Sequence, residues 1–107
     1  MTEEQEKELK AKHPKFVRVT IAGKVLAFKP LNKAKVQQIK ADLNKSPELA
    51  VELLCNACGF QCIFGKEHFE ALADAYPLAF TGGDKDEPGV INALYDMARG
   101  GVQIETV

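Results

Sequence analysis

The sequence predicts an α+β fold in which one N-terminal β-hairpin packs against three or four α-helices. Two observations carry this prediction. Apolar and polar residues alternate along residues 16–29, as they do in half-buried strands. Farther along, apolar residues recur three and four positions apart, which is the period of an amphipathic helix. The chain of 107 residues suits one domain with a single core, which we place at residues 15–101.

Residues 1–14 are predicted to form a flexible, charged N-terminal arm. Thr2 and Gln5 have the spacing of a capping box, so a helix could start here. Only Leu9 and Ala11 are apolar in the segment that follows, which leaves no stripe to dock on a core. We therefore expect a solvated arm, and the alternative is an arm that orders on a partner.

The hairpin is predicted to pair residues 16–21 with residues 25–29. Gly23 lies between these strands and supplies the positive φ that a tight turn needs. Pro30 has no N–H for a strand ladder and closes the second strand. An isolated hairpin is marginal in water, so helices must cover its apolar face.

The first long helix is predicted to follow Asn32, which is a good N-cap residue. Val36, Ile39 and Leu43 fall on one face of this helix and should pack on the core.

A second helix is predicted to begin at Ser46 as N-cap, with Pro47 at its first position, and to end near Gly59. Its interior is apolar nearly all round, so we expect it to be buried centrally. The apolar positions are Leu49, Ala50, Val51, Leu53, Leu54 and Ala57.

Two further helices are predicted after the apolar link at residues 60–64. The first carries the stripe Phe69, Leu72, Ala73 and Tyr76 and ends at Pro77. Residues 78–89 have the composition of a loop. The last helix should run from Pro88 or Gly89 to Arg99 and bury Val90, Ile91, Leu94 and Ala98. Residues 102–107 are predicted to be a C-terminal tail.

Charge and composition exclude several classes of protein. The net charge of −1 provides no global basic field that would attract nucleic acid. The N-terminal segment lacks the apolar run of a secretory signal, and no stretch approaches the ~20 apolar residues of a membrane span. An odd number of cysteines, three, fits a reducing compartment. We therefore expect a cytoplasmic protein that does not contact a membrane.

The stretch CNACGFQC is the strongest chemical signal in the chain. Cys55, Cys58 and Cys62 have the spacing C-x2-C-x3-C, and His68 follows six residues later. One hypothesis is a small zinc-binding module that uses these four side chains as a Cys3His set. A redox site would need the cysteines at a helix start, whereas the predicted helix ends there. We favour the third interpretation, cysteine as a small buried apolar residue, and expect no metal and no cofactor.

Other candidate chemistry is weak. A nucleic-acid-associated phage regulator would use the lysines around the first long helix, but that helix has neither the arginines nor the aromatic residues that such sites favour. The lysines are Lys29, Lys33, Lys35, Lys40 and Lys45. Asp84, Asp86 and Glu87 lack the spacing of a calcium-binding loop. Two histidines and no glycine-rich phosphate loop make a poor case for catalysis, so we expect a non-enzyme without nucleic-acid partners.

The order of these parts resembles the small tail assembly chaperones of tailed bacteriophages and prophages. In that family a short hairpin ends in an aromatic-x-Pro step, here residues 28–30. A basic amphipathic helix follows, then an apolar helix, here LAVELLC, and a helix that closes on Tyr-Pro, here residues 76–77. The resemblance covers residues 16–99, and the cysteine cluster is not part of it.

The resemblance implies a non-catalytic binding role in the cytoplasm of a bacterial host. Its implied partners are the tape-measure protein and the tail-tube protein, and a homo-oligomer is a further possibility. An apolar groove between helices could accept an amphipathic helix from the client. The candidate partner-binding residues lie in short connections near the predicted helix ends: Phe60, Ile63, Phe64, Leu78 and Phe80.

Overall fold

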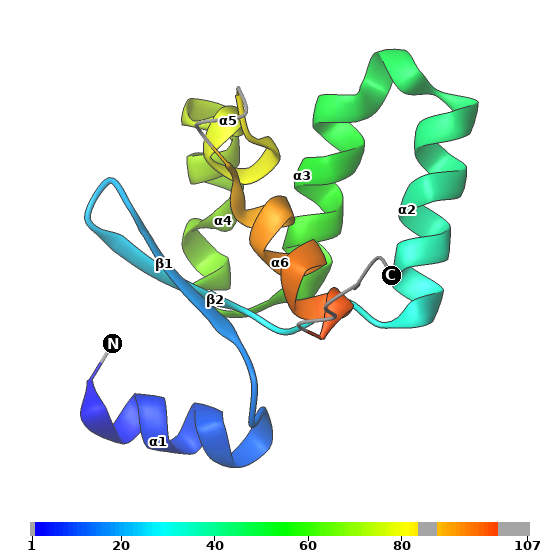
Figure 1. Cartoon of the computed structure of the whole chain (residues 1–107). Coiled ribbons are helices and arrows are strands. Elements are labelled where there is room, and N and C mark those ends of the chain that lie inside the picture. The colour runs from blue at the N-terminus through cyan, green and yellow to red at the C-terminus, as the bar shows by residue number, and fades with distance from the viewer. Residues whose placement is uncertain (1, 84–87, 101–107) are drawn as a thin grey trace, which may run out of the picture.

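The computed structural model describes residues 2–83 and 88–100 and confirms the α+β fold (Figure 1). Its strands are β1 (Val17–Ile21), β2 (Lys24–Phe28) and β3 (Cys62–Phe64). Its helices are α1 (Glu3–Lys12), α2 (Lys33–Lys45), the 3-10 turn η1 (Pro47–Leu49), α3 (Ala50–Gln61), α4 (Lys66–Ala75), α5 (Pro77–Thr81) and α6 (Val90–Arg99). The three strands form one antiparallel sheet in the order β1-β2-β3. Among the described residues, no helix has both the length and the apolar content that crossing a membrane requires.

The predicted hairpin is confirmed, and its turn is tighter than expected. Ile21 pairs with Lys24, so Ala22 and Gly23 alone connect the strands. Both residues have positive φ, 50° and 80°, which is the geometry of a two-residue hairpin turn that matches the twist of the strands. Gly23 adopts this conformation without the steric penalty that Ala22 bears.

A third strand replaces the link predicted at residues 60–64. β3 begins immediately after α3 and pairs with β2, with Phe28 opposite Cys62 and Ala27 opposite Phe64. The backbone N–H of Lys29 also donates to the carbonyl of Gln61 at 2.8 Å. β3 therefore ties the end of α3 to the hairpin.

The start of α2 is as predicted, whereas the start of α3 differs. The Asn32 side chain caps α2 by accepting a hydrogen bond from the N–H of Lys35 at 2.9 Å. Ser46 makes no side-chain cap, and Pro47 opens a short 3-10 turn instead. The helix also continues through Gly59, where an end was expected, as far as Gln61.

The expectation that α3 is buried centrally is wrong. Only Ala57, Cys58 and Gln61 of this helix are buried. Val51 is 50% exposed, and Leu49 just before the helix is 44% exposed. α3 packs against α2, α4, α5 and α6, but part of its apolar surface stays uncovered.

The later helices show three further departures from the prediction. Residues 77–81, most of which were assigned to a loop, form α5. Tyr76 and Ala98 are exposed, although both were placed on buried stripes. The predicted burial of Val90, Ile91 and Leu94 in α6 is confirmed.

Three phenylalanines from distant parts of the chain form the centre of the core. Phe28, Phe69 and Phe80 meet edge to face, with ring centroids 5.0–6.4 Å apart. Such contacts add about 0.5–1.5 kcal/mol per pair to the effect of burial. They join β2, α4 and α5 into one unit, and α4 and α5 lie beside α3 (Figure 1).

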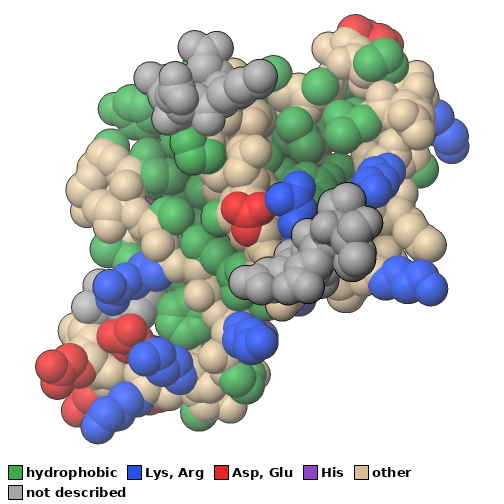
Figure 2. Space-filling model, viewed as in Figure 1, with side chains coloured by type: hydrophobic (Ala, Val, Ile, Leu, Met, Phe, Trp, Pro, Cys, Tyr) green, Lys and Arg blue, Asp and Glu red, His purple; other side chains and the backbone are tan. Residues whose placement is uncertain are grey.

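The N-terminal segment is a helix that stands apart from the other helices (Figure 1). The predicted capping box is present, because the N–H of Gln5 donates to the Thr2 hydroxyl at 3.2 Å and the Thr2 N–H donates to the Gln5 side chain at 3.0 Å. Leu9 is its buried residue and is not a member of the main core cluster. Charged side chains of both signs cover its surface (Figure 2). The predicted tail at residues 102–107 lies outside the described residues.

Candidate functional site

The three cysteines direct their thiols at backbone carbonyls. The Sγ of Cys55 lies 4.0 Å from the carbonyl oxygen of Pro77, and the Sγ of Cys58 lies 3.9 Å from that of Phe80. The Sγ of Cys62 lies 3.3 Å from the carbonyl oxygen of Phe64 on its own strand. Two of the thiols thus connect α3 to α5 as weak hydrogen-bond donors. Only a protonated thiol can donate in this way.

The electrostatics of these thiols oppose thiolate formation. Burial raises the pKa of Cys58 to about 12, helped by the negative charges that Cys55 and Cys62 would carry. Burial also raises the pKa of Cys55 and of Cys62. Metal ligation and nucleophilic attack both need the thiolate, so the shifts run against either chemistry.

His68, the fourth ligand in the zinc hypothesis, lies on α4, and its side chain is 42% exposed. Its Nε2 is 3.6 Å from a carboxylate oxygen of Glu67. Within residues 2–83 and 88–100, no three histidine, cysteine or acidic side chains gather closely enough to hold a metal ion. Cys58 and Cys62 are buried and Cys55 is partly buried, as is typical of cysteines that pack as small apolar residues. The acidic residues Asp84, Asp86 and Glu87 lie outside the described residues.

The five candidate partner-binding residues fall into three groups. Phe60 is 63% exposed and Leu78 is 58% exposed, so both are available to a partner. Ile63 and Phe64 are half-buried on β3. Phe80 has no exposed surface and belongs to the aromatic core, which corrects its assignment as a binding residue.

The lysines of α2 lie on the outer side of the molecule, as predicted (Figure 2). One of them is engaged: the Nζ of Lys35 sits 4.3 Å from the centroid of the Phe60 ring. This cation–π contact holds an exposed aromatic ring in place between α2 and α3.

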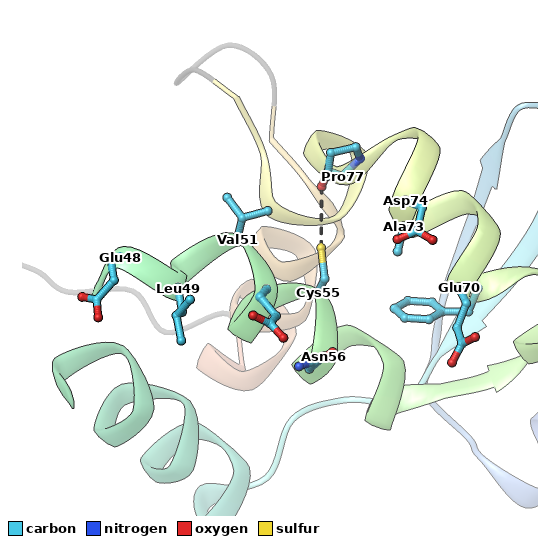
Figure 3. A pocket seen from close by; sticks show the side chains of 11 residues that line it. Glu48, Leu49, Val51, Cys55, Asn56, Glu70, Ala73, Asp74 and Pro77 are labelled. Atoms are coloured by element: carbon cyan, nitrogen blue, oxygen red, sulfur yellow. Dashed lines mark hydrogen bonds between the residues drawn. The ribbon is translucent and has the colours of Figure 1, made fainter. Parts of the chain in front are cut away.

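An open groove of about 680 Å³ lies between α3 and α4 (Figure 3). Its floor is formed by apolar side chains, among them Val51 and Cys55 of α3 and Ala73 of α4. Pro77 closes one end, where the dashed line in Figure 3 marks the contact of its carbonyl with Cys55. This surface combines hollow shape with uncovered apolar area, which is typical of binding sites.

The rim of the groove is acidic. Glu70 and Asp74 of α4 line it, and Glu48 lines it from the η1 side (Figure 3). Glu52 of α3 is a further lining residue. No lysine or arginine among the described residues lines this groove. The negative charge of Asp74 also contributes to the raised pKa of Cys55, after burial, which places that carboxylate close to the floor.

Sequence reasoning missed the groove residues for a physical reason. Leu49 and Val51 were assigned to a buried interior. Glu70 and Asp74 are like charges four positions apart on α4, but this spacing alone does not indicate a hollow.

Comparison of the chain with protein families, with curated proteins and with solved structures finds no significant match. Function is therefore inferred from the residues and geometry described above.

Proposed function

We propose that this chain is a non-catalytic interaction protein that acts as a tail assembly chaperone of a phage or prophage. In this role it binds the tape-measure protein, the tail-tube protein or both in the cytoplasm of the bacterial host. The observation that carries the binding role is the set of large apolar side chains left exposed on and beside α3. They are Leu49, Val51, Phe60, Tyr76 and Leu78.

This exposure favours a client that is itself partly apolar. Single apolar residues are common on protein surfaces, but two of these residues, Leu49 and Val51, line one groove, and exposed apolar surface in a hollow favours an interaction site. A chaperone for a long helical client needs such a surface, because it must cover the client's apolar stripe until assembly. The phage assignment itself comes from the order of parts in the sequence, from the Phe28-Lys29-Pro30 step to Tyr76-Pro77.

The titratable groups support a binding role over catalysis. Among the described residues, each resolved shift raises the pKa of a cysteine or of Tyr95, which moves the group away from its reactive, deprotonated form at neutral pH. A nucleophile would need the opposite shift.

The test is co-expression of this chain with a phage tape-measure protein from the same genome, followed by capture through a tag on this chain. We expect the tape-measure protein to remain in solution and to be captured at micromolar concentration. The double variant Leu49→Ser/Leu78→Ser should weaken capture, because it removes exposed apolar area without opening the core.

The matched control is Ala11→Ser/Ala98→Ser, which alters two exposed apolar positions on α1 and α6. It should capture the client as well as the unaltered chain does. Failure of the unaltered chain to capture either the tape-measure or the tail-tube protein would refute the proposed function. Light scattering of the same samples measures whether two copies of this chain cover the exposed surface instead.

A further inference from the structure

We propose that the groove between α3 and α4 binds a cationic amphipathic helix of the partner, with the apolar side of that helix on the groove floor and its lysines or arginines between two rows of carboxylates. The inference rests on the proposed role as an interaction protein and adds the chemistry of the segment that is recognised.

The apolar floor provides the first half of the argument. Leu49 and Val51 present uncovered aliphatic surface at one end, and the Cys55 side chain lies between them and Pro77 (Figure 3). A partner that buries this surface gains the hydrophobic free energy that the monomer leaves unused. The floor alone would accept almost any apolar segment, so it does not select a partner.

The charges of the rim provide the selection. Glu48 and Glu52 line the groove from η1 and α3, and Glu70 and Asp74 line it from α4, so both sides of the groove contribute carboxylates. None of the four takes part in an ion pair within the described part of the chain. Glu70 and Asp74 are spaced i,i+4 on α4, so these two carboxylates repel one another when nothing is bound. A cationic partner relieves this repulsion, whereas an acidic partner increases it.

The shape of the surface fits a helix. A neighbouring hollow of about 460 Å³ shares Asn56, Phe69 and Glu70 with the groove, so the depression continues along α3 toward Phe60. The 12 residues of α3 span ~18 Å, which is about three turns of a bound helix.

The walls are helices, so they offer no free strand edge to the bound segment. An extended segment would find no strand to pair with in this groove, whereas a helix satisfies its own backbone hydrogen bonds and needs none from the walls. Its recognition signature is a stripe of apolar residues at i, i+3, i+4 and i+7 flanked by lysine or arginine.

The experiment uses two synthetic peptides of roughly 16 residues, long enough for appreciable helix content. Both carry the same leucine and alanine stripe; one has lysines and the other glutamates at the flanking positions. We expect the lysine peptide to bind the full chain at least about tenfold more tightly than the glutamate peptide, and to lose affinity as salt rises. Backbone amide shifts on binding should map to α3 and α4.

Charge reversal at the rim provides the decisive variant. E70K/D74K replaces two exposed carboxylates on α4 with lysines, which cancels the negative charge of Glu48 and Glu52 and should abolish the preference between the peptides. The matched control E4K/E8K makes the same change in net charge on α1 and should keep the wild-type preference. E48Q/E52Q, on the other wall, should reduce the preference for the lysine peptide. This variant provides the test if E70K/D74K fails to fold.

Equal affinity for the two peptides, no binding of either, or an unchanged preference in the rim variants would overturn the inference. These results are separate from the test of the proposed function. If E70K/D74K captures the tape-measure protein as well as the unaltered chain does, the groove inference fails and the chaperone role stands. If the lysine peptide binds as expected but neither tail protein is captured, the groove inference stands and the chaperone role fails.

Discussion

The thiol of Cys58 points at the backbone carbonyl of Phe80, with 3.9 Å between the sulfur and the oxygen. This contact joins α3 to α5 at the centre of the molecule, where neither side chain has any exposed surface. Cys55, one helical turn earlier, makes the corresponding approach to Pro77 at 4.0 Å. The spacing of these two cysteines therefore reflects the docking of one helix on another.

Alkaline pH should destabilise the fold through Cys58. Its pKa is about 12 in the folded chain against 9.0 for a free thiol, so the folded state retains the proton that the unfolded state loses. The stability due to this group is complete below pH 9.0 and is lost as the pH rises toward 12, by at most about 1.4 kcal/mol per pH unit.

Urea unfolding of the unaltered chain and of Cys58→Ala, measured between pH 7 and pH 10.5, checks this prediction. The variant lacks the titrating group, so its stability should fall less steeply above pH 9.0 than that of the unaltered chain. Parallel curves for the two proteins would show that Cys58 does not contribute.

Zinc should neither bind nor stabilise this chain. Cys58 and Cys62 point at the carbonyls of Phe80 and Phe64, and His68 lies on the surface beside Glu67. We expect metal analysis of the purified protein to find no zinc, and a chelator to leave the thermal midpoint unchanged. One bound equivalent whose removal unfolds the chain would contradict this prediction and restore the zinc-module hypothesis.

Gly59 permits the close approach of α3 to α4. A Cβ at this position would lie 2.8 Å from Cε1 of Phe69, a ring that Phe28 and Phe80 already hold from two sides. Gly59→Ala gains up to about 1 kcal/mol of helix propensity but overpacks the core, which typically costs 1–3 kcal/mol. We expect a net loss of about 1 kcal/mol, or roughly 5 °C in the thermal midpoint.

The same substitution in a Phe69→Leu chain separates the gain in helix propensity from the cost of overpacking. In a Phe69→Leu chain the ring is absent, so Gly59→Ala should be neutral or stabilising there. Stabilisation by Gly59→Ala in the unaltered chain as well would mean that the aromatic cluster can shift aside.

The parts of the fold that were predictable depend on local signals. The Asn32 side chain caps α2 through a hydrogen bond to Lys35, only three residues along the chain. The alternation of apolar and polar residues in the hairpin is visible within a dozen residues. β3 was not predictable in this way, because it has three residues and is defined by pairing with Ala27 and Phe28, far away in the sequence. α5 was missed because its glycine-rich surroundings resemble a loop.

The candidate site was only partly predictable, since exposure depends on tertiary packing. Phe60 and Phe80 lie in similarly apolar stretches, yet Phe60 is 63% exposed and Phe80 is fully buried. The difference arises from α5, which turns Phe80 inward. The groove likewise depends on how α3 and α4 diverge, and the sequence contains no local signal for that.

Gln61 makes the buried polar connection between the helices and the sheet. Its side-chain amide donates to the carbonyls of Pro30 at 2.7 Å and Lys29 at 3.3 Å, and the residue is almost wholly buried. Gln61→Glu places a carboxylate against these carbonyls, so at pH 7 we expect a loss of roughly 3 kcal/mol or more.

The pH dependence of this variant identifies the cause. Burial should raise the pKa of the new carboxyl above its usual value of ~4.3, so stability should recover as the pH falls and the protonated acid donates again. Urea unfolding at pH 7 and pH 4.5 measures this, with Gln38→Glu on the exposed face of α2 as the matched control. Equal losses at both pH values would exclude the proposed electrostatic cause.

Substitutions of Phe60 and Phe80 should have different effects on client binding and on stability. Phe80→Ala empties the centre of the aromatic cluster and should cost about 3–5 kcal/mol. Phe60→Ala removes an exposed ring whose described partner is the ammonium of Lys35, at 4.3 Å, so we expect a loss below about 1 kcal/mol. If Phe60 belongs to the client surface, the same change should weaken capture of the tape-measure protein by tenfold or more, about 1.4 kcal/mol.

Lys35→Gln is the control for this comparison, because it removes the cation but leaves the ring exposed. Its stability should match that of Phe60→Ala within a few tenths of a kcal/mol, while its capture of the client should stay near that of the unaltered chain. Thermal unfolding and capture assays on the same preparations measure both quantities. Full capture by Phe60→Ala would remove Phe60 from the client surface, and a large loss of stability would show that its ring packs in solution.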